Sequence, residues 1–349
     1  MKKQILAGVL SATMVVGMGG VSVFAADGAD DKTYNIGICQ LVQHEALDAA
    51  TQGFKDAITE ELGDKVTFDE QNAQGDSNTC STIITDFVSD NVDLILANAT
   101  PALQAAAAGT ADIPILGTSV TEYGVALDLD DFDGTVGNNI SGTSDLAPLE
   151  DQAAMLNELF PDAKNVGLVY CSAEANSQYQ VDTVKAALEK LGYTCEYYAF
   201  SDSNDLSSVA TTAATESDVI YLPTDNTVAS NTEIINNICL PEKVPVIAGE
   251  EGICEGCGVA TLSISYYDLG VATGKMALKV LVDGEDISKM PIEYAPQFTK
   301  EYNPEICKEL GIEVPDDYVA IGADAEEETS EDDTDAADDT IEETTEKAE

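Results

Sequence analysis

The stretch that decides the fold is residues 34–54, YNIGICQLVQHEALDAATQGF. Residues 34–39 are mostly apolar and predict a buried strand, and the residues from 45 onward predict a helix. Three polar side chains lie at the join: Gln40, Gln43 and His44. Open α/β sheets bind ligands at the carboxyl ends of their strands, so this join predicts a site for a small molecule.

Apolar runs alternate with amphipathic segments along most of the chain, which predicts βαβ units with parallel sheets and helices on both faces. The expected strands are 34–39, 66–70, 92–97, 113–117, 165–170, 194–200, 218–222 and 244–248. The alternation pauses at residues 128–148 and then restarts, which predicts two Rossmann-like lobes. We assign residues 34–140 plus 250–290 to lobe I and residues 145–248 plus 292–318 to lobe II. Two or three crossing strands would form the hinge; two independent domains on one linker are the alternative.

The two ends of the chain differ in composition from the part between them. Residues 1–25 have two lysines, an apolar run and Val23-Phe24-Ala25, as in a secretory signal peptide cleaved near Ala25. Residues 324–349 contain fourteen acidic residues and one lysine, so we expect a disordered tail. We therefore expect a secreted, extracytoplasmic protein. No cysteine precedes Cys39, which argues against a lipid anchor.

The charge composition excludes some ligand classes. The formal net charge of −50 argues against nucleic acid as a partner, because phosphate binding requires basic patches. All fifteen basic residues are lysine. Without arginine, a ligand carboxylate would have to be held by hydroxyls and by N–H groups at helix starts.

The eight cysteines do not define a metal or cofactor site. Cys39, Cys171 and Cys195 fall within expected strands, where cysteine serves as a small apolar residue. Cys254 and Cys257 form a CxxC that would hold either a local disulfide or two free thiols. No second CxxC or histidine pair completes a zinc site, so we predict neither metal nor cofactor.

Polar residues recur at the ends of successive expected strands, and two such sets would face each other across a cleft between the lobes. Any one of them could instead cap a helix or a turn. The predicted ligand-binding residues are Gln40, Gln43, His44, Asn72, Gln74, Thr100, Ser119, Thr121, Ser144, Glu174, Asn176, Ser177, Asp225, Asn226 and Glu250.

Catalytic motifs are poorly represented. There is no GxSxG, GxGxxG or P-loop sequence, and His44 is the only histidine. An exported hydrolase would have to use His44 as its base, whereas a receptor would use it as a ligand contact or at a helix start. We therefore predict a binding protein and no enzyme.

At these same residues the chain resembles the substrate-binding proteins of ABC importers in the tryptophan/tyrosine-type group, which have the type I periplasmic-binding fold. The resemblance covers about residues 34–317. The matching features are Gln40-x-x-x-His44-x-x-Leu47-Asp48, Gly53-Phe54, Asn72-Ala-Gln74-Gly75-Asp76, Ala99-Thr100-Pro101, Ile113-Pro114-Ile115, Ser141-Gly-Thr-Ser144-Asp145, Glu174-Ala-Asn176-Ser177, Tyr266-Tyr-Asp268-Leu-Gly270, Asn303-Pro-Glu305 and Leu310-Gly-Ile312.

The resemblance implies that the lobes close over one small ligand, an aromatic or related amino acid, and that the closed form docks on ABC permease subunits. We expect a monomer. Thr100, Ser119 and Thr121 could hold the ligand carboxylate, and Asp225 or Glu174 could pair with its ammonium. Tyr123, Tyr179 and Tyr266 are candidates for an aromatic wall. A sugar or nucleoside receptor and a sensor module remain as alternatives.

Overall fold

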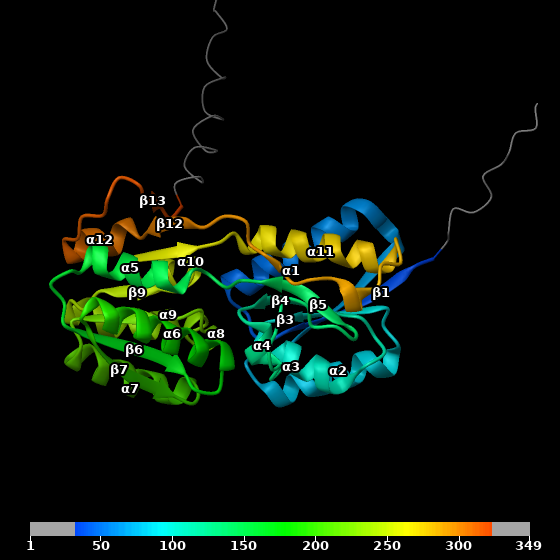
Figure 1. The fold of residues 1–349 in the computed structure, drawn as a ribbon, viewed down its shortest axis with the longest axis horizontal. Helices are drawn as coiled ribbons and strands as arrows, with labels where there is room; N and C mark the ends of the chain where they lie inside the picture. Colours follow the sequence, from blue (N-terminus) through cyan, green and yellow to red (C-terminus); the bar gives the residue numbers. More distant parts are fainter. Residues whose placement is uncertain (1–31, 323–349) are drawn as a thin grey trace, which may run out of the picture. The chain divides into compact units, whose positions relative to one another are not determined.

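The computed structural model describes residues 32–322 of the 349-residue chain. The expected signal peptide and acidic tail lie outside these described residues. Residues 33–322 contain two α/β lobes, each built on its own sheet (Figure 1). The predicted fold class, two lobes of mainly parallel strands flanked by helices, is confirmed.

The first lobe has the strand order β11-β5-β4-β3-β1-β2, with all neighbours parallel. Its strands are β1 (Tyr34–Gln40), β2 (Val66–Asn72), β3 (Leu94–Asn98), β4 (Ile115–Val120), β5 (Ile140–Ser144) and β11 (Glu293–Tyr294). Its helices are α1 (Glu45–Leu62), α2 (Ser77–Asp90), α3 (Thr100–Gly109), α4 (Tyr123–Ala126) and α11 (Tyr266–Leu281), with 3-10 turns at Gly63–Lys65 and Ile287–Lys289.

The second lobe has the order β13-β12-β10-β9-β8-β6-β7, and only β12 runs antiparallel to its neighbour β10. Its strands are β6 (Asn165–Cys171), β7 (Thr194–Phe200), β8 (Val219–Leu222), β9 (Val246–Ala248), β10 (Ala260–Ser263), β12 (Thr299–Tyr302) and β13 (Val319–Ala320). Its helices are α5 (Leu149–Leu159), α6 (Ala175–Leu191), α7 (Ser203–Glu216), α8 (Asn226–Ala229), α9 (Thr232–Glu242), α10 (Glu251–Cys257) and α12 (Pro304–Leu310).

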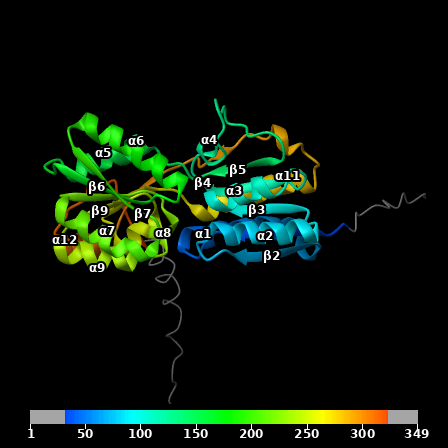
Figure 2. The ribbon, with the colours of Figure 1, turned by 90° about the horizontal axis from the view of Figure 1, so that it is seen from below.

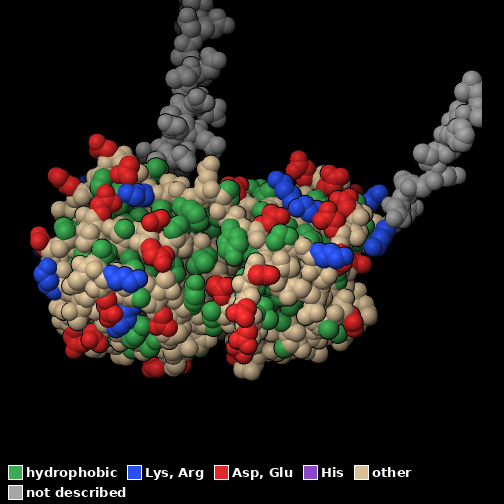
Figure 3. Space-filling view, viewed as in Figure 1, with side chains coloured by type: hydrophobic (Ala, Val, Ile, Leu, Met, Phe, Trp, Pro, Cys, Tyr) green, Lys and Arg blue, Asp and Glu red, His purple; other side chains and the backbone are tan. Residues whose placement is uncertain are grey.

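Each sheet has an apolar core on both faces, as expected for buried parallel strands. In the first lobe α2 and α3 cover one face and α1 and α11 cover the other (Figure 1). In the second lobe α5 and α6 pack on one face and α7 and α9 on the other (Figure 2). On the face drawn in Figure 3, acidic side chains are widely spread and lysines are fewer, in keeping with the net charge of −50.

Helices α1 and α11 lie with their backbones in direct contact. A Cβ on Gly270 would collide with the carbonyl oxygen of Ala50, and one on Gly53 would collide with the carbonyl oxygen of Tyr267. A Cβ on Gly274 would lie 2.8 Å from the carbonyl oxygen of Phe54. Only glycine allows such an approach, so these three positions explain why the two helices pack so closely.

Two of the expected lobe boundaries are wrong. We assigned residues 250–290 to lobe I, but β10 pairs with β9 and β12 in the second sheet. The short helix α10 joins β9 to β10 as one βαβ unit, which keeps both strands in one sheet. We assigned residues 292–318 to lobe II, but β11 pairs with β5 in the first sheet. The chain therefore passes between the lobes at residues 145–148, 264–265 and 295–298.

All eight cysteines are buried free thiols, including the pair in the CxxC. Burial raises the pKa of Cys171, Cys195 and Cys307 to about 11. Within residues 32–322 no group of three or more His, Cys, Asp or Glu side chains is arranged to hold a metal ion.

Candidate functional site

A small cavity of about 10 Å³ lies between the two lobes, about the room of a single water molecule. Its walls come from the carboxyl ends of strands in both sheets and from the starts of the helices that follow them. They are formed by His44, Leu47, Ser119, Thr121, Asp145, Asn176, Thr224, Asp225, Asn226, Ala229, Glu250 and Tyr266. Seven of these were predicted from the sequence: His44, Ser119, Thr121, Asn176, Asp225, Asn226 and Glu250.

His44 joins the two lobes at this cavity. Its Nε2 lies 3.2 Å from Oδ1 of Asn226, which begins α8 of the other lobe. Burial lowers the pKa of His44 below its ordinary value, and the contact with Asn226 and the charges of Glu174 and Asp48 partly offset this. The histidine is therefore held as a neutral partner of Asn226, as expected for an inter-lobe contact.

Glu174 organises the wall from the second lobe. Its Oε1 accepts hydrogen bonds from the N–H of Thr227 at 3.0 Å and the hydroxyl of Thr227 at 2.8 Å. Its Oε2 accepts from Nδ2 of Asn226 at 2.6 Å and the N–H of Asn226 at 3.1 Å. Nδ2 of Asn176 donates to the same oxygen at 3.3 Å. Glu174 thereby fixes the position of Asn226.

Asp225 and Glu250 are helix caps. Asp225 accepts from the N–H groups of Cys171 at 2.6 Å and Val228 at 2.9 Å. Glu250 accepts from Gly252 at 2.8 Å and Ile253 at 2.6 Å. Burial raises the pKa of each carboxyl to about 7, while these hydrogen bonds act in the opposite direction. Both carboxyls already have a partner for each oxygen.

Asp145 differs from the other cavity carboxyls because one of its oxygens has no partner. Oδ2 accepts a 3.0 Å hydrogen bond from the hydroxyl of Tyr266, whereas the buried Oδ1 makes none. The residue is 5% exposed. Burial raises its pKa to about 6, while the nearby Thr121 side chain and the hydrogen bond from Tyr266 act in the opposite direction.

Three further buried polar atoms lack partners in this region: Thr100 Oγ1, Ser119 Oγ and Asn176 Oδ1. Ser119 and Asn176 line the cavity, and Thr100 begins α3. Buried polar atoms without partners are rare in proteins, and those that exist often face a ligand site.

The backbone is strained at the same strand ends. Ser119 has φ 53°, and Ala99, which precedes Thr100, has φ 90°. The register of β4 against β5 also shifts between Gly117 and Val120, as at a β-bulge. Strained backbone and bulges cluster at binding sites, where they redirect side chains.

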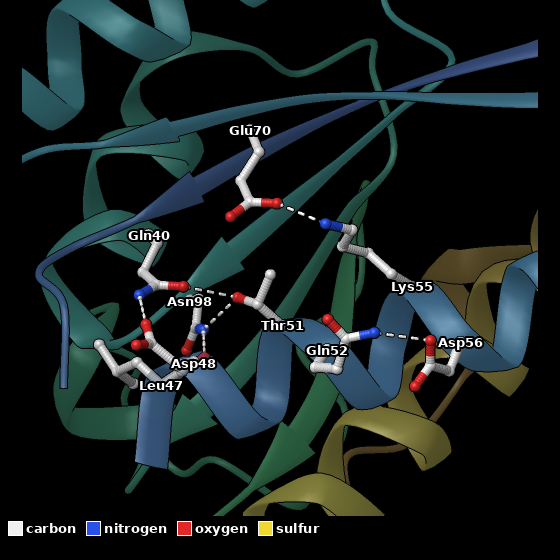
Figure 4. A network of polar contacts seen from close by, with 9 residues as sticks. All are labelled: Gln40, Leu47, Asp48, Thr51, Gln52, Lys55, Asp56, Glu70 and Asn98. Atoms are coloured by element: carbon white, nitrogen blue, oxygen red, sulfur yellow. Dashed lines mark hydrogen bonds and ion pairs between the residues drawn. The ribbon is translucent and has the colours of Figure 1, made fainter. Parts of the chain in front are cut away.

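Two residues predicted as ligand contacts, Gln40 and Asn72, make hydrogen bonds within the first lobe. Gln40 donates to Oδ1 of Asp48 at 2.6 Å and accepts from the hydroxyl of Thr51 at 2.7 Å (Figure 4). Asn98 donates to the same hydroxyl at 2.9 Å, so the network joins β1 and β3 to α1. Asn72 accepts from the N–H of Gln74 in a turn.

The remaining predicted residues lie beside the cavity. Ser144 donates to the carbonyl of Thr121 at 2.8 Å and supports the cavity wall from behind. Ser177 is fully buried at the start of α6, next to Asn176. Gln74 and Glu174 border a neighbouring hollow of about 420 Å³, and Gln43 borders another of about 310 Å³.

Five cavity residues were absent from the predicted set: Leu47, Asp145, Thr224, Ala229 and Tyr266. Asp145 directly follows the last residue of β5 and so occupies a strand end like the predicted residues. We had assigned it as the first residue of lobe II. Of the three tyrosines considered for the wall, Tyr266 lines the cavity, whereas Tyr123 is buried and donates to the carbonyl of Thr143.

The chain matches the family model described as ABC transporter substrate binding protein over residues 35–326. It belongs to this family, whose members are extracytoplasmic solute-binding receptors. Within residues 32–322 no helix is both long and apolar enough to cross a membrane.

Individual relatives agree with this assignment. A tyrosine-binding protein from Clostridioides difficile (strain R20291) is 35% identical over 320 residues, which cover 88% of this chain and 91% of that protein. An ABC domain from Streptococcus pneumoniae in complex with L-Trp has a TM-score of 0.78 at 33% identity, covering 82% of this chain and 97% of the other.

A third relative differs in conformation. The ligand-free, open structure of a substrate-binding protein with adhesive properties from Clostridium difficile is 38% identical and covers 83% of this chain and 99% of its own. Its TM-score is 0.64, lower than that of the L-Trp complex despite the higher identity. By TM-score, the structure as a whole is therefore more similar to the ligand-bound relative than to the open one.

Proposed function

We propose that this protein is the receptor of an ABC importer and captures a small amino acid, with an aromatic side chain, in the cavity between its lobes. The observation that carries the proposal is the set of buried, unpartnered polar atoms facing that cavity: Ser119 Oγ, Asp145 Oδ1 and Asn176 Oδ1. A zwitterionic ligand offers both donors and acceptors to such a set. The relatives that bind tyrosine and L-Trp support the choice of ligand.

The size of the cavity implies that ligand entry requires movement. About 10 Å³ is too small for an amino acid, so the lobes must separate and side chains must shift. The three segments that pass between the lobes allow a hinge motion of this kind. The closed, liganded form would then be delivered to membrane permease subunits. We further propose that the receptor works outside the cytoplasm as a monomer, with its signal peptide removed.

A thermal-shift screen of the purified protein against amino acids, sugars and nucleosides tests the ligand class. A ligand present at about a thousand times its dissociation constant adds about 4 kcal/mol to the free energy of unfolding. We expect tyrosine, tryptophan or phenylalanine to raise the melting temperature. A rise with sugars or nucleosides alone would contradict the proposal.

The same samples test whether binding is the whole activity. We expect the bound amino acid to be recovered chemically unchanged after prolonged incubation, because His44 is committed to Asn226 and has no nucleophile as a partner. Conversion of the ligand, detected by mass spectrometry, would show that the protein is an enzyme.

A further inference from the structure

We propose that Asp145, oriented by Tyr266, is the carboxylate that receives the α-ammonium group of the ligand. The inference rests on the proposed function and assigns one end of the ligand to one end of the cavity. It replaces the earlier expectation that Asp225 or Glu174 pairs with the ammonium.

The hydrogen bonds make the other carboxylates of the site less suitable partners for the ammonium than Asp145. Both oxygens of Glu174 are occupied by Asn176, Asn226 and Thr227. Both oxygens of Asp225 and of Glu250 accept backbone N–H groups. An ammonium group at these residues would have to share oxygens that already hold the loops and helix starts in place. Asp145 Oδ1 is instead a buried carboxylate oxygen of a cavity residue that has no partner to share.

The surroundings of Asp145 favour a cation. The residue is 5% exposed and makes none of the ion pairs found among residues 32–322. A buried carboxylate without a positive partner is destabilising, and the ligand's own ammonium would supply that partner. Asn176 Oδ1, from the other lobe, is a second unpartnered acceptor on the same cavity.

The opposite end of an amino acid finds a hydroxyl donor in the same cavity, and a second unpartnered hydroxyl lies outside its lining. The Ser119 hydroxyl lines it without a partner, and the buried Thr100 hydroxyl lies at the start of α3. Hydroxyls near a helix start suit a carboxylate, and the chain has no arginine for this purpose. The proposal therefore predicts a ligand that carries both groups.

The position of Asp145 links ligand recognition to closure. Asp145 begins the crossing segment 145–148, and Tyr266 follows the crossing segment 264–265. Their 3.0 Å hydrogen bond joins two of the three connections between the lobes. An ammonium bound to Asp145 and Asn176 would contact this junction and the second lobe at once.

Calorimetric titration with matched ligand pairs tests the assignment. Each aromatic amino acid is compared with its des-amino analogue, for example tyrosine with 3-(4-hydroxyphenyl)propanoate. For the unmodified protein we expect the amine to improve affinity by at least about 100-fold, the range for a buried charge pair. For Asp145→Asn we expect a loss of about 100-fold for the amino acid and less than about fivefold for the analogue. Tyr266→Phe should weaken the amino acid by about tenfold, because it removes the hydroxyl that orients Asp145.

The control is Asp151→Asn, which changes an exposed carboxylate at the start of α5 and should leave all affinities unchanged. An Asp145→Asn protein that is folded by circular dichroism but binds the amino acid as tightly as the unmodified protein would overturn this proposal alone. Failure of the unmodified protein to bind any amino acid would overturn the receptor proposal and this one with it.

A pH titration of the unmodified protein provides a test that needs no folded variant. Because the pKa of Asp145 is raised to about 6, affinity for the amino acid should fall below about pH 6, by up to tenfold per pH unit, as the carboxylate is protonated. The other titratable groups that face it are Tyr123, Tyr266 and, through Tyr266, Glu250. His44 and Asp225 line the same cavity, and the pKa of Asp225 is raised to about 7. The des-amino analogue is the control for titration of these other groups, because its affinity should not fall at low pH. An equal fall in affinity for both ligands would contradict the proposal.

Discussion

Two buried serines of the first lobe, Ser119 and Ser141, differ in whether the protein itself uses their hydroxyls. Ser141 donates to the carbonyl oxygen of Met290 at 3.0 Å and so connects β5 to the chain before β11. Ser119 Oγ lines the cavity and has no partner. Removing a hydroxyl that makes a hydrogen bond within the protein lowers stability. Removing a hydroxyl without such a bond affects only the binding of a ligand that would bond to it.

We therefore expect opposite effects from two alanine substitutions. Ser119→Ala should change the free energy of unfolding by less than about 0.5 kcal/mol and weaken amino-acid binding by about 1–2 kcal/mol. Ser141→Ala should cost about 1 kcal/mol of stability and leave affinity unchanged. Urea denaturation and calorimetry measure the two quantities. Equal stability losses in both variants would show that Ser119 Oγ has a structural partner.

At the residue level the sequence identified the strand ends but not the role of each side chain. Gln40 and Asn72 have the same polar character as Asn176 and Asn226, yet they bond within their own lobe. Asp145 was not predicted because what distinguishes it is an oxygen without a partner. That property depends on neighbours from β4 and α11, which are distant in sequence.

Among the helices, the contact of α1 with α11 sets the tightest requirement on sequence. Gly270→Ala would place a methyl group against the carbonyl of Ala50, and the two backbones would have to move apart. We expect a loss of about 2–4 kcal/mol in the free energy of unfolding, as for an overpacked core. Gly252→Ala, in α10, is the control: its nearest neighbours would lie 3.4 Å or more away, so it should be neutral or stabilising. Equal denaturation midpoints for the two variants would refute this interpretation of the contact.

At the level of elements, hydrophobic pattern predicted most strands to within a few residues, because a buried parallel strand requires a continuous apolar run. It failed where the element was short. Residues 226–242 form two helices, α8 and α9, which are separated at Ser230 and Asn231. Helix α10 has the sequence EGICEGC, and its two glycines do not indicate a helix. The sequence pattern therefore gives no sign of the connection that places β10 in the second sheet.

The whole molecule should lose stability as pH rises from about 4 to 7. The pKa of Asp145 is raised to about 6, and those of Asp225 and Glu250 to about 7. The folded protein therefore retains protons that the unfolded chain has released, so folding becomes less favourable as these groups ionise. Thermal melts at constant ionic strength should show a falling melting temperature, with a shallower slope for Asp145→Asn. A flat or rising curve would show that these carboxyls are ionised throughout the range.

Opening of the lobes should be visible at one thiol. Cys171 ends β6 and borders the 420 Å³ hollow, although it is only 2% exposed. We expect iodoacetamide to modify it before the other cysteines, and a bound amino acid to slow the reaction by holding the lobes together. Mass spectrometry of the alkylated protein measures the rate at each site, and Cys171→Ala should remove the ligand-sensitive reaction. Modification that does not respond to ligand would argue against opening at this edge.

We expected two or three crossings between the lobes, and the chain passes between them at three places. The sequence signal was a chain that returned to the first lobe late, and α11 does so. The sequence does not show which sheet a strand of four residues such as β10 joins. That depends on the edge strand that is open for pairing, here β9 of the second sheet.

The glycine-lined contact of α1 with α11 also has a mechanical consequence. Both helices begin at the cavity, with His44 and Leu47 at one start and Tyr266 at the other. Because their backbones touch, neither helix can slide or tilt without the other. The first lobe therefore moves as a rigid body. A ligand that displaces either helix start would therefore move the first lobe as one body, and the bending would fall on the connections at residues 145–148, 264–265 and 295–298.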